Sequence, residues 1–360
     1  MKLVYTLGKL DVGGAEVRSL RLFRGLRELG VEFDAVIYII SGELGALDKD
    51  FEALGLKIVY GRPGLRGLIH LWNFLMKYRP TIFHTNVSTA NGYYALAAKM
   101  ARIPVVISHY RSLNDVREGG FHAAKAALGR FLANRISRSV VGVCNAAQAF
   151  AHAPNDKWVT LYNGIDLPHS NNNDCRRNDL VIGYLGRISP EKNPHRSLDI
   201  LEAILRDDRG RNAKLRVAGG GTPDQLRVFA EDVKQRRLEN SVEICGVTDQ
   251  PIEFLRKCTV LLLPSHREGL PGAVLEALSV GTPVVANDLP GVQEIATAVE
   301  GVLTCPLSAN NIEWAELVFD ATKMARPNIA ASFAQGPFLI HRHLQSVLAL
   351  WEHSIASVAP

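Results

Sequence analysis

Residues 260–276 read Val-Leu-Leu-Leu-Pro-Ser-His-Arg-Glu-Gly-Leu-Pro-Gly-Ala-Val-Leu-Glu. The apolar run 260–264 predicts a buried strand. Pro271 is placed as the first residue of a helix, because proline suits that position and biases Leu270 away from helical torsions. A strand, a short loop and a helix form the repeating unit of an α/β fold.

Two glutamates lie eight positions apart in this segment, Glu268 on the predicted loop and Glu276 on the predicted helix. Were both helical, they would be about 12 Å apart along the axis, farther than the roughly 5 to 9.5 Å between the carboxylates of a glycosidase. This spacing favours holding two ends of one elongated ligand, with free N–H groups at the helix start as a seat for phosphate or sugar oxygens. The alternative is a helix that merely carries surface glutamates.

Short apolar runs alternate with helical patterns along almost the whole chain, which predicts two doubly wound units of parallel sheet covered by helices. A length of 360 residues also exceeds what one core usually holds. The predicted domains are residues 1–168 and 169–335, joined by a polar stretch, and residues 336–360 contain a final helix that could cover either domain. Strands are predicted near residues 2–7, 34–40, 56–60, 81–84, 104–108, 139–143 and 158–161, then 180–185, 214–218, 242–245, 260–263, 283–286 and 301–304.

The chain has the composition of an ordinary soluble protein, with 47% hydrophobic and 21% charged residues. No apolar run approaches the ~18 residues of a membrane span, and the N-terminal apolar stretch is short, so we expect a cytoplasmic protein. The five cysteines are scattered without a Cys-x-x-Cys spacing, which predicts reduced thiols and no zinc site. No Asp-x-Asp or His-Glu cluster has metal-ligand spacing, so we expect no metal and no cofactor. The sequence indicates no oligomeric state.

Charge is distributed unevenly. Residues 1–168 contain 21 Lys or Arg and 13 Asp or Glu, a net charge of +8, whereas the remainder has 20 and 23, a net −3. Residues 62–138 contain twelve basic residues against Asp115 and Glu118. The first half is therefore expected to face an anionic partner: a phosphorylated substrate, an anionic membrane surface or, ranked last for want of any known motif, nucleic acid.

Two basic helical stretches could carry a membrane contact. The first has arginines at every third position beside apolar residues, and the second extends over residues 121–140. Such helices can lie on anionic lipid at the inner face of the cell membrane, or they can be ordinary surface helices packed on a sheet. The residues concerned are Arg18, Arg21, Arg24 and Arg27 with Leu20, Phe23 and Leu26, then Lys125, Arg130, Arg135 and Arg138 with Leu128, Phe131, Leu132 and Ile136.

Open parallel sheets bind ligands at the carboxyl ends of their strands, so the loops there are the candidate sites. Gly13 and Gly14 open a helix after the first strand, where small residues let a phosphate approach backbone amides; a plain tight turn is the alternative. Arg187 and Lys192 follow the first strand of the second half and can neutralise a diphosphate, or belong to a solvated turn. His109, expected to end the strand 104–108, can contact a sugar hydroxyl or be structural.

Together these motifs resemble glycosyltransferase family 4, whose members are retaining, nucleotide-sugar-dependent enzymes of the two-domain GT-B fold. The resemblance extends in order over nearly the whole chain. The matching positions are residues 13–16 (Gly-Gly-Ala-Glu), His109, residues 163–166 (Asn-Gly-Ile-Asp), Arg187, Lys192 and residues 268–276.

The resemblance implies two Rossmann-like domains with a cleft between them, the acceptor on the first, the donor on the second, and a C-terminal helix that crosses back to the first. Arg187 and Lys192 would bind the donor diphosphate, helped by the backbone of Gly14, and Glu268 the hydroxyls of the transferred sugar. His109 would contact that sugar near the reacting carbon. These four side chains are the expected catalytic residues.

The remaining donor contacts are also implied by the resemblance. Backbone amides of Gly269, Leu270 and Pro271 would bind sugar or phosphate oxygens. Glu276 would bind the ribose, and Val247 is a candidate to contact the base of the nucleotide. The donor would be a UDP or GDP sugar, and the acceptor a hydroxyl of a glycan or lipid-linked precursor of an envelope or extracellular polysaccharide. The expected enzyme is a metal-independent hexosyltransferase that retains anomeric configuration.

One segment departs from the family pattern, and three other activities stay open. Members often have an acidic residue where this chain has glycine at residues 219–221. A sugar-nucleotide epimerase or phosphorylase could share the architecture, although no pyridoxal lysine is evident. An inactive binding or assembly subunit is a second alternative. A dehydrogenase is disfavoured because the Gly-x-Gly-x-x-Gly fingerprint is missing.

Overall fold

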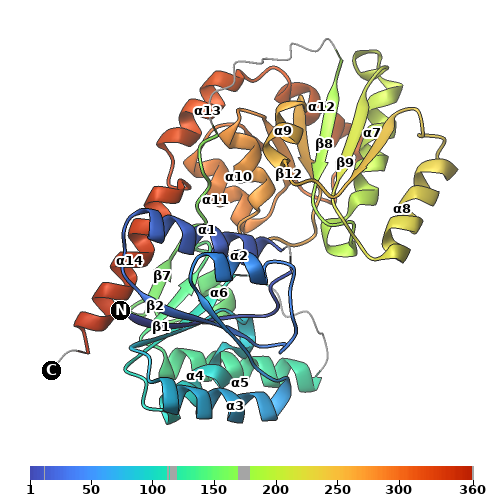
Figure 1. The fold of residues 1–360 in the computed structure, drawn as a ribbon. Coiled ribbons are helices and arrows are strands. Elements are labelled where there is room, and N and C mark those ends of the chain that lie inside the picture. The colour runs from blue at the N-terminus through green and yellow to red at the C-terminus, as the bar shows by residue number, and fades with distance from the viewer. Residues whose placement is uncertain (12, 112, 114–119, 169–178, 359–360) are drawn as a thin grey trace. The chain divides into compact units, whose positions relative to one another are not determined.

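The structure is a computed structural model that describes residues 1–11, 13–111, 113, 120–168 and 179–358 (Figure 1). The chain forms two compact units. Unit 1 comprises Met1–Gly164 together with Ile340–Pro360, and unit 2 comprises Ile165–Leu339. Three residues noted in the sequence lie outside the described part, namely Asp115, Glu118 and Cys175.

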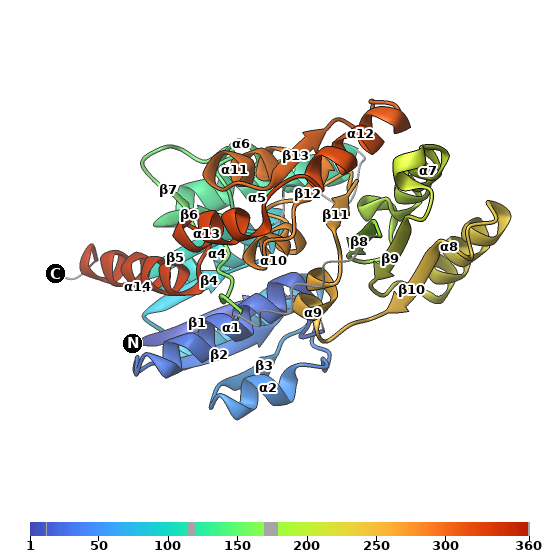
Figure 2. The same ribbon diagram turned by 90° about the horizontal axis from the view of Figure 1, so that it is seen from above.

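Unit 1 is built on a parallel sheet of seven strands in the order β3-β2-β1-β4-β5-β6-β7 (Figures 1 and 2). The inner strands are mostly apolar because both faces of a parallel sheet are buried by crossover helices, whereas the edge strands β3 and β7 are only partly buried. The order reverses between β1 and β4, which places a ligand-binding switch point there. The strands are β1 (Lys2–Leu7), β2 (Asp34–Ile39), β3 (Lys57–Tyr60), β4 (Ile82–Thr85), β5 (Val105–Tyr110), β6 (Ser139–Gly142) and β7 (Trp158–Thr160).

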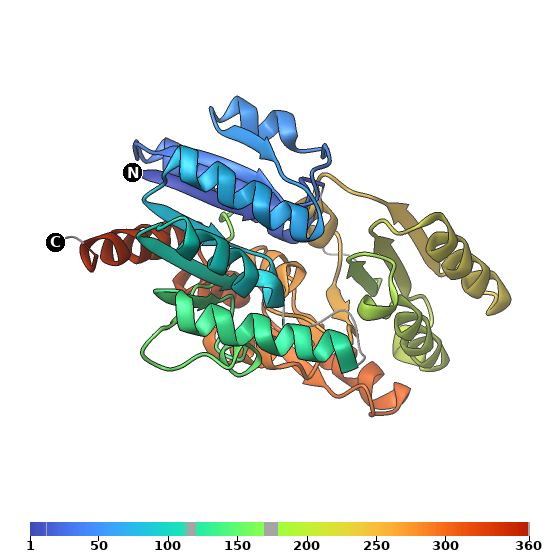
Figure 3. The ribbon, with the colours of Figure 1, turned by 90° about the horizontal axis from the view of Figure 1, so that it is seen from below.

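Two layers of helices cover the sheet of unit 1. On one face, α1, α2 and α14 bury Phe23, Phe51 and Trp351 against the strands. On the other face, α3 and α4 bury Leu71, Tyr94 and their neighbours, and α5 packs beside α4 (Figure 3). The helices are α1 (Gly14–Glu28), α2 (Asp48–Ala53), α3 (Gly64–Tyr78), the 3-10 turn η1 (Ser88–Ala90), α4 (Asn91–Met100), α5 (Gly120–Ile136), α6 (Ala147–Ala151) and α14 (Ile340–Ala356).

Unit 2 repeats the design with six parallel strands in the order β10-β9-β8-β11-β12-β13, so its switch point lies between β8 and β11. Helices α7, α8 and α12 bury one face through Leu198, Phe229 and Trp314. The strands are β8 (Val181–Leu185), β9 (Lys214–Ala218), β10 (Val242–Gly246), β11 (Val260–Leu263), β12 (Val284–Asn287) and β13 (Val302–Cys305). The helices are η2 (Pro190–Lys192), α7 (Pro194–Arg206), η3 (Asp208–Gly210), α8 (Pro223–Gln235), α9 (Pro251–Arg256), α10 (Gly272–Ser279), α11 (Pro290–Ala298), α12 (Asn311–Ala321) and α13 (Arg326–Gln335).

The last helix, α14, belongs to unit 1 although the chain reaches it only after completing unit 2. Leu344, Val347 and Trp351 are buried in the core shared with α1 and the sheet. Gly25 lets the two helices meet, because a Cβ there would lie 2.7 Å from Leu344 Cδ1. The helical pattern near the C-terminus therefore covers the first of the two domains.

The predicted two-domain α/β fold is confirmed, and every predicted strand is present within two residues of its expected bounds. Several local predictions were wrong. The basic helix expected over residues 121–140 ends at Ile136, because Arg138 N already bonds to Val106 O as the chain enters β6. His109 does not end its strand, since β5 continues to Tyr110, which pairs with Gly142.

The apolar side of α1 does not face outward as a membrane contact would require. Leu20, Phe23 and Leu26 are buried in the core of unit 1, so the arginines of this helix border a packed helix. None of the helices in the described part of the chain combines the length and the hydropathy that a membrane span needs.

Candidate active site

The switch point of unit 2 brings two loops together at the carboxyl edge of its sheet. The loop after β8 contains Arg187 and Lys192, and the loop after β11 contains Glu268. β8 and β11 are adjacent strands, but the chain leaves them towards opposite edges of the sheet. The loops that follow these two strands therefore diverge, and a ligand can bind between them. Residues 76 positions apart in sequence meet in this way.

An ion pair joins the two loops. Lys192 Nζ lies 2.5 Å from Glu268 Oε1, and Ser265 Oγ donates to the same oxygen at 3.0 Å. Ser265 is itself held by Asn287, whose Nδ2 donates to the Ser265 carbonyl at 2.9 Å. The Glu268 side chain is only 9% exposed, and its other oxygen, Oε2, makes no hydrogen bond with any described residue. The carboxylate is thus oriented, with one acceptor oxygen to spare.

The loop after β8 is held by hydrogen bonds to its backbone, and the side chain of Arg187 is exposed. The buried Tyr184 hydroxyl donates to the Arg187 carbonyl at 2.9 Å, and Ile188 N donates to Gly220 O at 2.7 Å. The exposed Arg187 guanidinium makes no hydrogen bond or ion pair with a described residue. The pKa of the Glu191 carboxyl lies below its usual range, mainly because of its own backbone N–H, and the charge of Arg187 makes a smaller contribution.

The glycine-rich loop after β9 packs closely against the β8 loop at Gly219 and Gly221. Gly219 has φ +154°, and a Cβ there would lie 1.8 Å from Gly186 O. Gly219 N also donates to Gly246 O at 2.8 Å, which ties this loop to the one after β10. Val247 follows and is 75% exposed, with its Cγ2 3.0 Å from the position of a Cβ on Gly220. A side chain at residue 219 would therefore clash with the β8 loop, whereas at Gly220 a Cβ would meet only the side chain of Val247.

The helix after the β11 loop, α10, begins one residue later than predicted. Pro271 is its N-cap, with ψ 117°, and the first helical residue is Gly272. Pro271 has no N–H, so the expectation that it offers a backbone donor is wrong; the free N–H groups at this helix start come from the residues after it. Glu276 lies on this short helix and is half-buried, whereas Glu268 lies on the loop.

The backbone at Gly269 touches the next loop of the sheet. A Cβ on Gly291, the second residue of α11, would lie 1.7 Å from the Gly269 carbonyl oxygen. Leu270 beside it is buried at 5% exposure. The loop that carries Glu268 is therefore clamped between its own helix and the start of α11.

The switch point of unit 1 lies between β1 and β4, and a cation spans the loops around it. Gly13 is the N-cap of α1 and Gly14 its first residue. Arg111, just after β5, donates through Nη1 to the Ala15 carbonyl at 3.2 Å and through Nε to Asn86 Oδ1 at 2.9 Å. Arg111 and Asn86 received no role from the sequence, although both follow directly on the carboxyl ends of strands, a position that could have identified them.

His109 is buried in unit 1 at 1% exposure and belongs to a chain of ring nitrogens. Its Nδ1 lies 3.3 Å from His84 Nε2, and Trp351 Nε1 donates to His84 Nδ1 at 3.1 Å. Burial, and secondarily the charge of Arg111, lowers the pKa of His84 to about 3 and that of His109 well below its usual value. Both imidazoles are therefore neutral.

The residues predicted from the sequence form two groups, one in each unit. Unit 2 gathers the phosphate, sugar and base candidates at one sheet edge; these are Arg187, Lys192, Val247, Glu268, Gly269, Leu270, Pro271 and Glu276. Unit 1 contains Gly13, Gly14 and His109. Among the described residues, no group of three or more His, Cys, Asp or Glu is placed to hold a metal ion.

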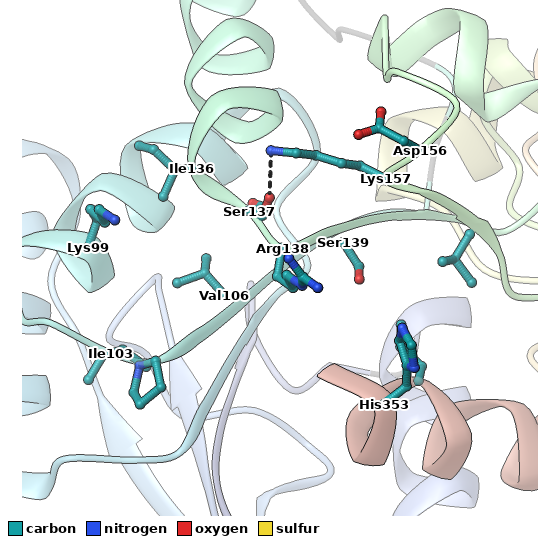
Figure 4. Close-up of a pocket in the computed structure, with 13 residues that line it drawn as sticks. Lys99, Ile103, Val106, Ile136, Ser137, Arg138, Ser139, Asp156, Lys157 and His353 are labelled. Atoms are coloured by element: carbon teal, nitrogen blue, oxygen red, sulfur yellow. Dashed lines mark hydrogen bonds between the residues drawn. The ribbon is translucent and has the colours of Figure 1, made fainter. Parts of the chain in front are cut away.

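A separate pocket of about 570 Å³ lies at the opposite edge of the unit 1 sheet, at the amino ends of β5, β6 and β7 (Figure 4). Its walls include the cations Lys99, Arg138 and Lys157 and the side chain of His353. Lys157 is already engaged, because its Nζ donates to Ser137 O at 3.1 Å. None of the predicted catalytic or donor-binding residues lines this pocket, although Ile136 and Arg138 of the second basic stretch do.

Comparison with known proteins agrees with this geometry. Residues 12–168 match the family described as "Glycosyltransferase Family 4", and residues 169–318 match "Glycosyl transferases group 1". The capsular polysaccharide biosynthesis glycosyltransferase CapM of Staphylococcus aureus is 32% identical over 306 residues, 79% of each chain. CapH of the same organism, also named as a capsular polysaccharide biosynthesis glycosyltransferase, is 25% identical over 82% of this chain and 83% of its own.

Solved structures show the same fold at low sequence identity. The Anabaena protein HepE, crystallised with UDP, superposes with a TM-score of 0.81 and 18% identity over 98% of this chain and all of its own. The lipopolysaccharide outer core galactosyltransferase WaaB has a TM-score of 0.74 over the full length of both chains. With the match to CapM and the two family descriptions that together span residues 12–318, the chain belongs to glycosyltransferase family 4 and is a glycosyltransferase of the GT-B fold.

Proposed function

We propose that this glycosyltransferase transfers a sugar, with retention of configuration, from a nucleoside diphosphate sugar of the UDP or GDP type to a hydroxyl of a glycan or lipid-linked acceptor. The observation that carries the proposal is the cluster at the switch point of unit 2. There Lys192, Ser265 and Glu268 form one hydrogen-bonded group beside the exposed Arg187.

Each part of this cluster suits one part of the donor. Arg187 offers a guanidinium fork that matches phosphate oxygens. The Lys192 ammonium has three donors, of which Glu268 occupies one, so two can reach the diphosphate. The spare oxygen of Glu268 accepts a hydrogen bond from a sugar hydroxyl, and the first N–H groups of α10 can bind sugar or phosphate oxygens.

The nucleoside would lie towards the remaining candidates. Glu276, on α10, would accept hydrogen bonds from the ribose hydroxyls, and the exposed Val247 would border the base. On the other unit, the helix start at Gly13 and Gly14 would assist the diphosphate, and His109 would contact the transferred sugar.

The cluster supports catalysis by stabilising the leaving group. Glu268 Oε1 already accepts from Lys192 and Ser265, which suits a carboxylate that anchors a sugar hydroxyl through its other oxygen better than a nucleophile that attacks carbon. As the sugar–phosphate bond breaks, negative charge grows on the diphosphate, where Arg187, Lys192 and the start of α10 stabilise it. The incoming hydroxyl would attack from the same face and pass its proton to the leaving phosphate, which preserves configuration without a metal.

The names of the relatives support an acceptor in envelope polysaccharide synthesis, since CapM and CapH are both described as capsular polysaccharide biosynthesis enzymes. We infer that the acceptor is presented at the inner, anionic face of the cell membrane. Unit 1 has a face suited to that surface, formed by α3, α4 and α5 side by side (Figure 3).

This α3–α5 face combines cations with exposed apolar side chains. The sequences of the three helices contain no Asp or Glu at all. Their exposed cations include Arg66, Lys77, Lys99, Lys125 and Arg135. Large apolar side chains stand exposed among them: Leu65, Ile69 and Met76 on α3, Leu96 and Met100 on α4, and Leu128 (49%) and Phe131 (64%) on α5. Cations attract anionic headgroups while apolar side chains enter the interface, which favours a lipid surface over a soluble anion.

A donor screen tests the main proposal. The protein is heated with UDP, GDP and ADP sugars, and one series is expected to raise Tm, because a ligand at a hundred times its Kd adds about 2.7 kcal/mol of stability. The stabilising donor is then incubated with a lipid-linked acceptor, and the anomeric configuration of the product is read by NMR. Glu268→Ala should lower turnover about 100-fold or more in a protein that still folds. Absence of any donor-induced shift, or inversion in the product, contradicts the proposal.

A further inference from the structure

Three aromatic side chains of unit 1 form a directed chain of hydrogen bonds that ends at His109. Trp351 lies on α14, His84 on β4 and His109 on β5, and all three are buried. The Trp351 indole meets the His84 ring at 88°, with 6.2 Å between ring centroids. The last helix of the chain thus contacts, through one residue, a histidine in the middle of the sheet.

The direction of each bond follows from the chemistry of its ends. An indole N–H can only donate, so Trp351 requires an unprotonated, accepting Nδ1 on His84. A neutral imidazole has one proton, which on His84 must then sit on Nε2 and be donated to Nδ1 of His109. His109 consequently has its own single proton on Nε2.

The rings of His84 and His109 are kept neutral by their surroundings. Burial is the main cause that lowers the pKa of both histidines, and Arg111 adds a repelling positive charge. A third buried histidine, His343 on α14, would lower the pKa of both rings further if it were protonated. It is itself held neutral, with its pKa lowered to about 4 by burial, while its Nδ1 donates to the Tyr162 carbonyl.

His109 Nε2 is the last atom of this chain of hydrogen bonds. This atom is buried and has no hydrogen-bond partner among the residues that the structure describes. A buried donor without a partner destabilises the protein, so an oxygen brought to it would bind favourably. The tautomer decides what this atom can do, because a protonated Nε2 can donate a hydrogen bond but cannot take up a proton.

We propose that Trp351 and His84 are positioning residues that hold His109 in the tautomer with the proton on Nε2, which makes His109 a fixed hydrogen-bond donor to an oxygen of the transferred sugar. The proposal rests on the proposed function for the identity of the ligand, but the tautomer itself belongs to the protein alone. It follows that His109 is not the base that accepts the acceptor's proton, and that removal of one indole N–H on the final helix changes the chemistry of a residue on β5.

Nuclear magnetic resonance tests the tautomer directly. In full-length protein with ¹⁵N-labelled histidine, long-range ¹H–¹⁵N spectra distinguish a protonated ring nitrogen from an unprotonated one, and the signals are assigned with His84 and His109 variants. At pH 7.5, His84 and His109 should both show a protonated Nε2 and an unprotonated Nδ1. A proton on Nδ1 of His109 in the wild-type protein overturns the proposal, whatever the activity measurements show.

Substitution of the indole tests its cause. Trp351→Phe keeps an aromatic ring in the core but removes the donor, so His109 should shift to a mixture of tautomers and kcat should fall about tenfold, with little change in KM for the donor sugar. Trp314→Phe is the matched control, because Trp314 is equally buried but donates to the Pro306 carbonyl in unit 2. It should lower Tm comparably and leave the histidine spectrum unchanged.

A pair of variants at His84 separates hydrogen bonding from packing. Glutamine has a carbonyl that can accept from Trp351 and an amide that can donate to His109, so His84→Gln should preserve the His109 tautomer and most of kcat. His84→Leu should lose both. Equal loss in the two variants, or an unchanged His109 spectrum in His84→Leu, overturns the proposal. A wild-type protein with the expected tautomer but no sugar transfer would instead contradict the proposed function.

Discussion

Lys192 Nζ lies 2.5 Å from Glu268 Oε1, which ties the loop after β8 to the loop after β11. The two side chains are unequally buried, 24% exposed for lysine and 9% for glutamate. Loss of the lysine therefore leaves a carboxylate poorly solvated, whereas loss of the glutamate charge leaves an ammonium that water can reach.

This asymmetry predicts different costs for the two halves of the pair. Lys192→Met should lower Tm by about 5 °C, the effect of roughly 2 kcal/mol on a unit of this size, and Glu268→Gln by about 1–2 °C. Differential scanning calorimetry measures both. Lys323→Met is the matched control, because Lys323 pairs with Asp320 at 2.7 Å on the exposed surface of the same unit. Equal shifts for Lys192→Met and Glu268→Gln would show that burial does not govern this pair.

The contact between α11 and the Glu268 loop predicts a steric effect on donor binding. Gly291→Ala would place a methyl 1.7 Å from the Gly269 carbonyl oxygen, so the loop must move, at a cost of about 1–3 kcal/mol. Both Tm and the affinity for the donor, measured by calorimetry, should fall. Gly120→Ala serves as the control, since nothing would lie within 4 Å of its Cβ. Normal donor affinity in Gly291→Ala would mean that the clamp does not position the site.

The buried histidines of unit 1 predict acid sensitivity. Burial lowers the pKa of His84 to about 3 and of His343 to about 4 from the usual 6.5. Below pH 6.5 the unfolded chain takes up protons that the folded protein cannot. The contribution of the neutral histidines to the free energy of unfolding is therefore fully present above pH 6.5. It falls towards pH 4 by about 1 kcal/mol per pH unit for each histidine.

Urea unfolding at pH 7.5, 6 and 5 measures this slope. His343→Asn retains a side-chain amide that can donate to the Tyr162 carbonyl and removes one proton-binding site, so its slope should be smaller than that of the wild type. His353→Asn, at an exposed position of the same helix, should leave the slope unchanged. An identical slope for His343→Asn and the wild type would contradict the assignment.

The α3–α5 face predicts lipid binding through α5. Leu128→Glu with Phe131→Glu should abolish flotation with anionic liposomes at physiological salt, because it removes the apolar contact and adds two negative charges among the cations. Val228→Glu is the control, as Val228 is 46% exposed on α8 of unit 2. Binding should also weaken as salt rises. No flotation of the wild-type protein would refute the membrane contact.

Strand positions could be predicted from sequence because most strands are short apolar runs, fully buried at the centre of each sheet, and are bounded by loops with glycine or polar residues. The exact ends of helices and strands could not be predicted in the same way. β5 extends through His109 because β6 offers backbone partners as far as Gly142, and Pro271 caps α10 from outside. Cross-strand pairing and capping depend on neighbours that are distant in sequence, so local patterns could not place them.

The candidate site residues could also be identified from the sequence, because they follow strands whose carboxyl ends bind ligands in such sheets. These residues are Arg187, Lys192, Glu268 and Glu276. Their partners were decided only by tertiary structure. The strand order places β8 beside β11, and so joins Lys192 to Glu268 across 76 positions. The return of α14 to unit 1 places Trp351 against His84 across 267 positions. A hydrogen bond needs atoms within about 3.5 Å and in a set direction, and only the folded chain fixes which distant residues meet that condition.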